Sequence, residues 1–233
     1  MYIYIYIYMP YFNSNNVNLL FIHIPKTGGS SLETYFSKKY DISLDTKSLW
    51  MYLEDDKKET FNYYGTLQHL DYKTIIKYNS FFNINFDDIT ILAIVRNPYH
   101  RIISDLFWFS KIKSECCDNY MNNFNKNTSK EETYFIIKNY LEDSSIFLDN
   151  HNKPQHFFIT DINNELIHNI KILHTETLQT DMYNLGYTDF DVKENVNDCK
   201  IDYFDFLNQD SINLINHFYD TDFKLFNYDK IIL

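Results

Sequence analysis

A buried strand that runs into a glycine-containing turn and then into a helix is the feature that most constrains this fold. The strand is the apolar run at residues 19–24, and the turn reads P-K-T-G-G-S-S at residues 25–31. Only four glycines occur in 233 residues, so two in one turn indicate a backbone that must let another group approach closely. Backbone N–H groups of such a turn and of the following helix N-terminus suit a phosphate or sulfate.

The rest of the chain alternates predicted strands and helices, which is typical of an α/β fold with a parallel sheet. Apolar runs predict strands at residues 89–95 and 170–175, with a weaker one at 65–68. Helix-start signals predict helices that begin at Ser30, with Glu33 at capping-box spacing, at Asn97-Pro98, at Ser129 and near residue 210. Residues 41–64 and 113–130 are polar and are predicted to form loops or short helices.

The order of residues in the glycine turn separates it from the ordinary ATPase loop. A Walker A loop places its lysine after the glycines, whereas here Lys26 precedes Gly28 and Gly29. Lys26 supplies a positive charge for an anion. Hydroxyl donors follow it at Thr27, Ser30 and Ser31.

A second strand-to-helix junction carries an arginine. The strand at residues 89–95 leads into Arg96, and Ser104 lies about two turns into the helix that Pro98 opens. The planar guanidinium fork suits a phosphate. Many P-loop enzymes place an Mg²⁺-binding Asp at such a strand end, so Arg96 argues for direct phosphate contact, and no metal is expected.

Together these two motifs resemble those of the sulfotransferase family, in the branch that holds carbohydrate enzymes and short microbial and viral relatives. The turn at residues 25–31 is similar to the family's 5′-phosphosulfate loop, and Arg96 with Ser104 is similar to its 3′-phosphate motif. The resemblance covers about residues 19–229. It implies a single P-loop-NTPase-like α/β domain, with a central parallel sheet flanked by helices.

The resemblance also implies the chemistry. The donor would be 3′-phosphoadenosine 5′-phosphosulfate (PAPS), the product adenosine 3′,5′-bisphosphate, and the acceptor a hydroxyl group, most simply of a glycan. The expected donor-binding residues are Lys26, Thr27, Gly28, Gly29, Ser30, Ser31, Arg96 and Ser104.

Three residues are expected to carry out catalysis. Lys26 would stabilise the leaving phosphate, and His69 would accept the proton of the acceptor hydroxyl. Glu33 is the rival base, although its spacing from Ser30 favours a capping role. His151 and Gln155 are expected to border the acceptor groove.

Two other functions stay open from the sequence. One is a phosphotransferase that uses ATP and Mg²⁺, against which the position of Lys26 and the presence of Arg96 argue. The other is a relative that binds a nucleotide or glycan without catalysis, which the intact set of Lys26, His69, Arg96 and Ser104 does not favour.

The charge of the chain limits its partners. The formal net charge is −11, which disfavours nonspecific nucleic-acid binding, but residues 178–233 hold 11 acidic and 4 basic side chains. Both proposed anion motifs are locally basic, with net charges of +2 over residues 22–40 and +3 over residues 93–113. No apolar run is long enough for a membrane span and no signal peptide is evident, so a cytoplasmic location is expected.

The first residues alternate tyrosine and isoleucine. We expect residues 1–18 to form a peripheral extension and residues 19–233 to form the sulfotransferase domain.

Overall fold

The computed structural model describes residues 10–14, 17–42, 66–114, 127–145, 148–191 and 201–232. The chain divides into two compact units. Unit 1 comprises residues 1–95, 146–150 and 155–195, and unit 2 comprises residues 96–145, 151–154 and 196–233. The predicted loops at 41–64 and 113–130 lie mostly outside the described residues.

Unit 1 contains a four-stranded sheet with the spatial order β1-β2-β3-β4. Its strands are β1 (Tyr11–Ser14), β2 (Val17–Ile22), β3 (Thr90–Val95) and β4 (Lys171–His174). β2, β3 and β4 are parallel to one another, whereas β1 pairs antiparallel with β2. The predicted α/β fold with a largely parallel sheet is therefore confirmed.

The position of β1 shows that the expected boundary of the peripheral extension, at residue 18, lies too far along the chain. Tyr11 pairs with Leu20 across the sheet, and Phe12 is fully buried. An apolar residue at this position is buried because its side of the strand faces the core, so residues 11–14 belong to the sheet. Residues 1–9 lie outside the described part of the chain. That residues 19–233 form one domain stays a prediction.

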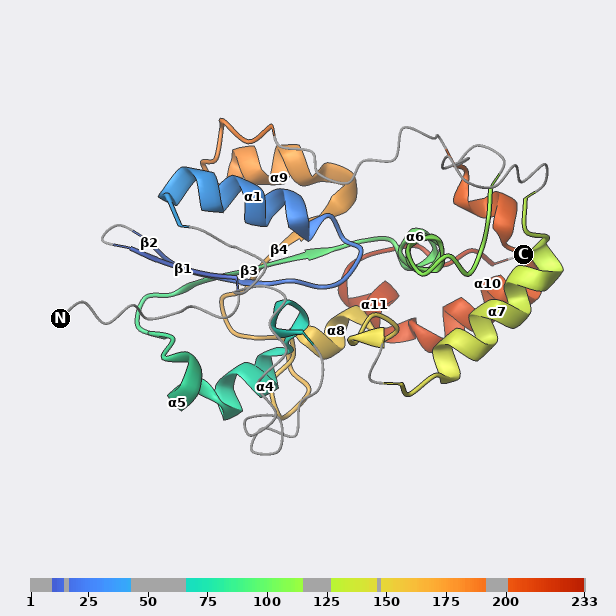
Figure 1. Ribbon diagram of the computed structural model, residues 1–233, viewed down its shortest axis with the longest axis horizontal. Helices are drawn as coiled ribbons and strands as arrows, with labels where there is room; N and C mark the ends of the chain where they lie inside the picture. Colours follow the sequence, from blue (N-terminus) through green and yellow to red (C-terminus); the bar gives the residue numbers. More distant parts are fainter. Residues whose placement is uncertain are drawn as a thin grey trace. The chain divides into compact units, whose positions relative to one another are not determined.

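Helices lie on both faces of this sheet (Figure 1). α1 (Gly29–Tyr40) and α9 (Leu178–Asn184) lie on one face, and α4 (Tyr72–Lys77) and α5 (Asn79–Phe82) lie on the other. Unit 1 also contains α8 (Gln155–Phe158) and the 3₁₀ helices η1 (Leu67–His69) and η4 (Thr175–Thr177).

The strand predicted at residues 65–68 was wrong. The described part of this segment is the single 3₁₀ turn η1, whose preceding residue Thr66 donates its backbone N–H to the carboxylate of Asp149. A side chain therefore takes the hydrogen bond that a neighbouring strand would have taken.

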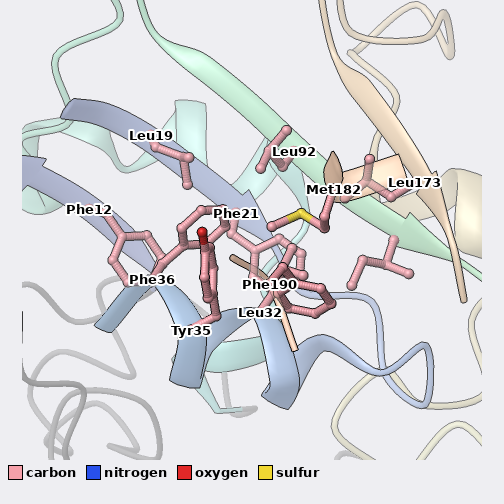
Figure 2. Close-up of a cluster of buried hydrophobic side chains, with 11 residues drawn as sticks. Phe12, Leu19, Phe21, Leu32, Tyr35, Phe36, Leu92, Leu173, Met182 and Phe190 are labelled. Atoms are coloured by element: carbon pink, nitrogen blue, oxygen red, sulfur yellow. The ribbon is translucent and has the colours of Figure 1, made fainter. Parts of the chain in front are cut away.

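The core of unit 1 lies between α1 and the sheet (Figure 2). Phe36 packs against Phe12 with ring centroids 5.4 Å apart, and both are fully buried. Leu32 and Phe21 belong to the same cluster. This packing fixes α1 against the strand that precedes it, and with it the turn at residues 25–28 that joins the two.

Unit 2 is helical in its described residues. It contains α6 (Pro98–Trp108), α7 (Lys130–Glu142), η5 (Tyr203–Phe206), α10 (Gln209–Phe218) and α11 (Asp220–Leu225). Asn97 caps α6 by accepting from the N–H of Tyr99, and Ser129 caps α7 by accepting from that of Glu132. The helices predicted from these two signals and near residue 210 are confirmed. None of the helices in the described ranges has the length and apolar character that a membrane crossing requires.

Candidate active site

The loop between β2 and α1 has an unusual backbone. Lys26 has a φ of 63° and Gly28 a φ of 88°, both in the left-handed region. A lysine in this region has a conformational free energy about 1 kcal/mol above that of ordinary backbone. Such strained residues cluster at functional sites. Thr27 lies between them, fully buried, and its hydroxyl donates to the carbonyl of Ile24 over 2.8 Å. The Thr27 hydroxyl, which we expected to donate to phosphate, therefore braces the turn in this structure.

A second threonine holds the loop to the ends of the neighbouring strands. Thr175 directly follows β4, and its hydroxyl lies 2.6 Å from the carbonyl of Thr27 and 3.1 Å from that of Val95. The loop is thus fixed at the carboxyl edge of the parallel strands. This edge is where open α/β sheets bind their ligands.

Gly29 is required by a close approach of His23. A Cβ atom built on Gly29 would lie 2.3 Å from two atoms of the His23 ring. His23 itself is buried, and its Nδ1 donates to Glu33 Oε1 over 2.7 Å. The second glycine of the motif therefore makes room for a buried histidine beneath the loop.

The N-terminus of α1 differs from the capping box that we predicted. The helix starts at Gly29 with Gly28 as its N-cap, and no side chain in the described ranges caps it. Glu33 instead turns into the interior, where it accepts from His23 and, at 2.9 Å, from Nε2 of Gln68. The buried donors hold this carboxylate more strongly than an exposed cap would, because buried charged groups need hydrogen-bond partners.

His69 is the other predicted catalytic residue, and it forms a pair with Asp149 in unit 1. Its Nδ1 lies 2.8 Å from Asp149 Oδ2, and its ring meets that of His23 edge-on at 5.0 Å between centroids. Thr66 donates to both oxygens of Asp149, through its N–H and its hydroxyl, over 2.5 Å each. A carboxylate that accepts from Nδ1–H leaves the lone pair of the neutral imidazole on Nε2, the arrangement of a general base.

Asp149 is a site residue that the sequence analysis missed. It lies 80 residues from His69 in the chain, so no local motif joins the two. Asp149 and Asn150 both adopt left-handed backbone, with φ of 47° and 64°, and Asn150 donates to the carbonyl of His69. An Asp-Asn pair favours such turns and is the only local signal, but it does not reveal the partner.

The predicted 3′-phosphate residues belong to unit 2. Arg96 lies between β3 and the N-cap of α6, Asn97, and Ser104 lies within that helix; both Arg96 and Ser104 are half-buried. Nη2 of Arg96 donates to the hydroxyl of Tyr203 over 2.9 Å. The sequence analysis did not predict this contact.

Comparison with known proteins agrees with these features. A family model described as the sulfotransferase family matches residues 9–229. The chain belongs to the sulfotransferase family. No curated protein and no solved structure matches it significantly.

In this sulfotransferase, the match begins before β1, in agreement with the strand pairing at residues 11–14. Lys26, which precedes the two glycines, and Arg96, which follows β3, both lie within the matched residues. That these residues bind the donor stays a prediction.

The two expected acceptor residues are less accessible than the sequence analysis assumed. His151, in unit 2, is buried, and its Nδ1 lies 2.7 Å from Asp105 Oδ1. Asp105 also accepts from the hydroxyl of Tyr140, whose pKa is raised by burial, so this hydroxyl stays protonated. Gln155, in unit 1, is fully buried. Acceptor contact by either residue stays a prediction.

Arg101 supports the same part of unit 2. It is buried, and its guanidinium donates to the backbone carbonyls of His151 and Lys153 over 2.7 and 2.8 Å. Arg101 therefore holds residues 151–153 against α6.

Proposed function

We propose that this sulfotransferase transfers a sulfuryl group from PAPS to a hydroxyl group of a carbohydrate. The observation that carries the proposal is the loop at residues 25–28, where strained backbone, a lysine and a helix N-terminus without a side-chain cap among the described residues coincide. An anion at this position would take the place of a capping side chain, because both satisfy the first N–H groups of the helix.

The loop and the 3′ motif would divide donor recognition between them. Lys26 and the N–H groups that begin α1 would bind the 5′-phosphosulfate, and Arg96 and Ser104 would bind the 3′-phosphate. The donor, when bound, supplies the sulfuryl group and a phosphate leaving group. The ammonium of Lys26 then offers positive charge where negative charge develops on the leaving oxygen.

His69 is the residue best placed to accept the acceptor proton. Its pairing with Asp149 orients the ring and stabilises the imidazolium that forms on proton transfer. Glu33, the rival base, has donors on both carboxylate oxygens, from His23 and Gln68, and is buried. These contacts support a structural role for Glu33 beneath the loop.

Charge supports a neutral or lightly charged glycan as the acceptor. The acidic side chains of residues 178–233 would repel a chain that is already heavily sulfated. A carbohydrate is the acceptor class that the resemblance implies. A cytoplasmic location and the absence of a metal requirement stay predictions.

Thermal stability in the presence of nucleotides tests the proposal. We expect adenosine 3′,5′-bisphosphate to raise the melting temperature of the protein in a buffer with EDTA, and Lys26→Ala to reduce that rise. The matched control is Lys77→Ala, because Lys77 is an exposed lysine of α4 in the same unit. Stabilisation only by ATP with Mg²⁺ would instead support the phosphotransferase alternative and overturn the proposal.

A further inference from the structure

Tyr203 forms a contact with the guanidinium of Arg96 that the sequence motif does not include. Its hydroxyl accepts from Nη2 of Arg96 at 2.9 Å, and the Cζ atom of Arg96 lies 5.3 Å from the centre of the tyrosine ring. One residue therefore contacts the arginine in two ways, by a hydrogen bond and by a cation–π contact. Both residues are half-buried, so the pair reaches the surface of unit 2.

The segment that carries Tyr203 is anchored on α6, the helix that follows Arg96. The Tyr203 ring packs against His100 at 5.1 Å between centroids, and Phe204 packs against Tyr99 at 5.8 Å. At the other end of the same helix, Phe107 meets Phe206 edge-on at 5.2 Å. These contacts hold η5 along α6.

The short helix η5 also has its own start signal. Asp202 caps it by accepting from the N–H of Phe204 over 2.9 Å. Tyr203 is therefore held by its local turn as well as by the aromatic contacts, and its hydroxyl has a defined position relative to Arg96.

A defined position matters because an arginine side chain is long and flexible. Free rotation about its single bonds would have to be lost when the guanidinium binds a phosphate, and that loss weakens binding. A contact that already orients the planar fork removes part of the cost.

We infer that Tyr203 is a positioning residue that orients Arg96 and thereby sets the preference for nucleotides that carry a 3′-phosphate. The inference rests on the proposed function, because it assigns a task to Arg96 within donor binding. It goes beyond the two sequence motifs, since Tyr203 lies 107 residues from Arg96 in the chain.

Calorimetric titration with two nucleotides tests the inference. Adenosine 3′,5′-bisphosphate and adenosine 5′-phosphate differ only in the 3′-phosphate. We expect Tyr203→Phe to weaken binding of the bisphosphate about tenfold, the size expected for one hydrogen bond to a charged group, and to leave the monophosphate affinity unchanged. Tyr134→Phe, at a half-buried tyrosine of α7 in the same unit, is the matched control and should change neither affinity.

A double-mutant cycle separates positioning from a general structural effect. If Tyr203 acts through Arg96, adding Tyr203→Phe to Arg96→Ala should weaken bisphosphate binding no further. Equal losses for both nucleotides, or a full additional loss in the Arg96→Ala background, would overturn the inference.

The nucleotide preference of the wild-type protein separates a failure of this inference from a failure of the proposed function. A wild-type protein that binds the bisphosphate no better than the monophosphate would contradict the proposed donor. A wild-type preference that survives Tyr203→Phe unchanged would overturn only the role of Tyr203.

Discussion

At the scale of single residues, the structure brings together candidate site residues that lie far apart in the sequence. The residue types and order in the two motifs, around Lys26 and Arg96, were enough to predict the family. The partners of the candidate base were not predictable, because Asp149 contacts His69 through folding and not through sequence proximity. The capping role predicted for Glu33 was wrong for the same reason, since its partner Gln68 lies 35 residues away.

His69→Ala tests the proposed base. We expect turnover to fall at least about tenfold, because a positioned general base contributes roughly 10²–10⁴ in rate. Affinity for adenosine 3′,5′-bisphosphate, measured by calorimetry, should be retained, which also shows that the variant is folded. Unchanged turnover would remove His69 from the mechanism.

Asp149→Asn tests whether His69 depends on its carboxylate partner. The amide keeps the size of the side chain but removes the charge that stabilises an imidazolium, so we expect kcat to fall while KM for the donor stays close to that of the wild type. Asp87→Asn, at an exposed position of the same unit, should leave kcat unchanged. A rise in the KM for the donor with kcat unchanged would show that Asp149 acts on binding and not on His69.

Gly29→Ala tests the close approach of His23 to the loop. The added Cβ would overlap the buried His23 ring, so we expect a loss of about 1–3 kcal/mol in the free energy of unfolding, measured by urea denaturation. Removing the ring should relieve the overlap, so the double variant with His23→Ala should lose less stability than the two single losses combined. Additive losses would contradict a direct clash.

At the scale of elements, helix and strand signals were reliable where the pattern is local. The caps at Asn97 and Ser129 lie where their side chains predicted them, because each contact stays within one turn of its helix. The segment at residues 65–68 and the start of α1 depend instead on Asp149, His23 and Gln68, which come from other parts of the chain. β1 was missed because residues 1–18 as a whole were expected to form a peripheral extension, and the pairing of Tyr11 with Leu20 became visible only in the fold.

The Phe12→Ala variant tests whether β1 is part of the core. Phe12 packs on Phe36 and Tyr40 of α1, so we expect a loss of about 3–5 kcal/mol in the free energy of unfolding. Ser14→Ala, at an exposed position on the same strand, should change stability by no more than about 0.5 kcal/mol. Similar small effects for both variants would contradict the placement of β1 in the sheet.

At the scale of the whole molecule, the net charge of −11 conceals an uneven distribution. Residues 178–233 hold 11 acidic and 4 basic side chains and so carry −7 of the total charge, whereas the segments around Lys26 and Arg96 are locally basic. An acidic protein can therefore bind an anionic donor, because the local charge of both motif segments is positive.

This distribution predicts a preference among acceptors. We expect a neutral oligosaccharide to be sulfated faster than the same backbone with several sulfate groups, and added salt to narrow the difference by screening the repulsion. Initial rates at two salt concentrations measure it. A faster reaction with the heavily sulfated chain, weakened by salt, would contradict the charge argument.

Transfer of radiolabelled sulfate from PAPS tests the central claim most directly. The wild-type protein would be incubated in EDTA with labelled donor and a panel of oligosaccharides, peptides and small alcohols, beside Lys26→Ala and the control Lys77→Ala. We predict label in an oligosaccharide with the wild type and the control, and little or none with Lys26→Ala. No transfer to any member of the panel by a protein that binds adenosine 3′,5′-bisphosphate would contradict the claim and indicate a catalytically silent relative.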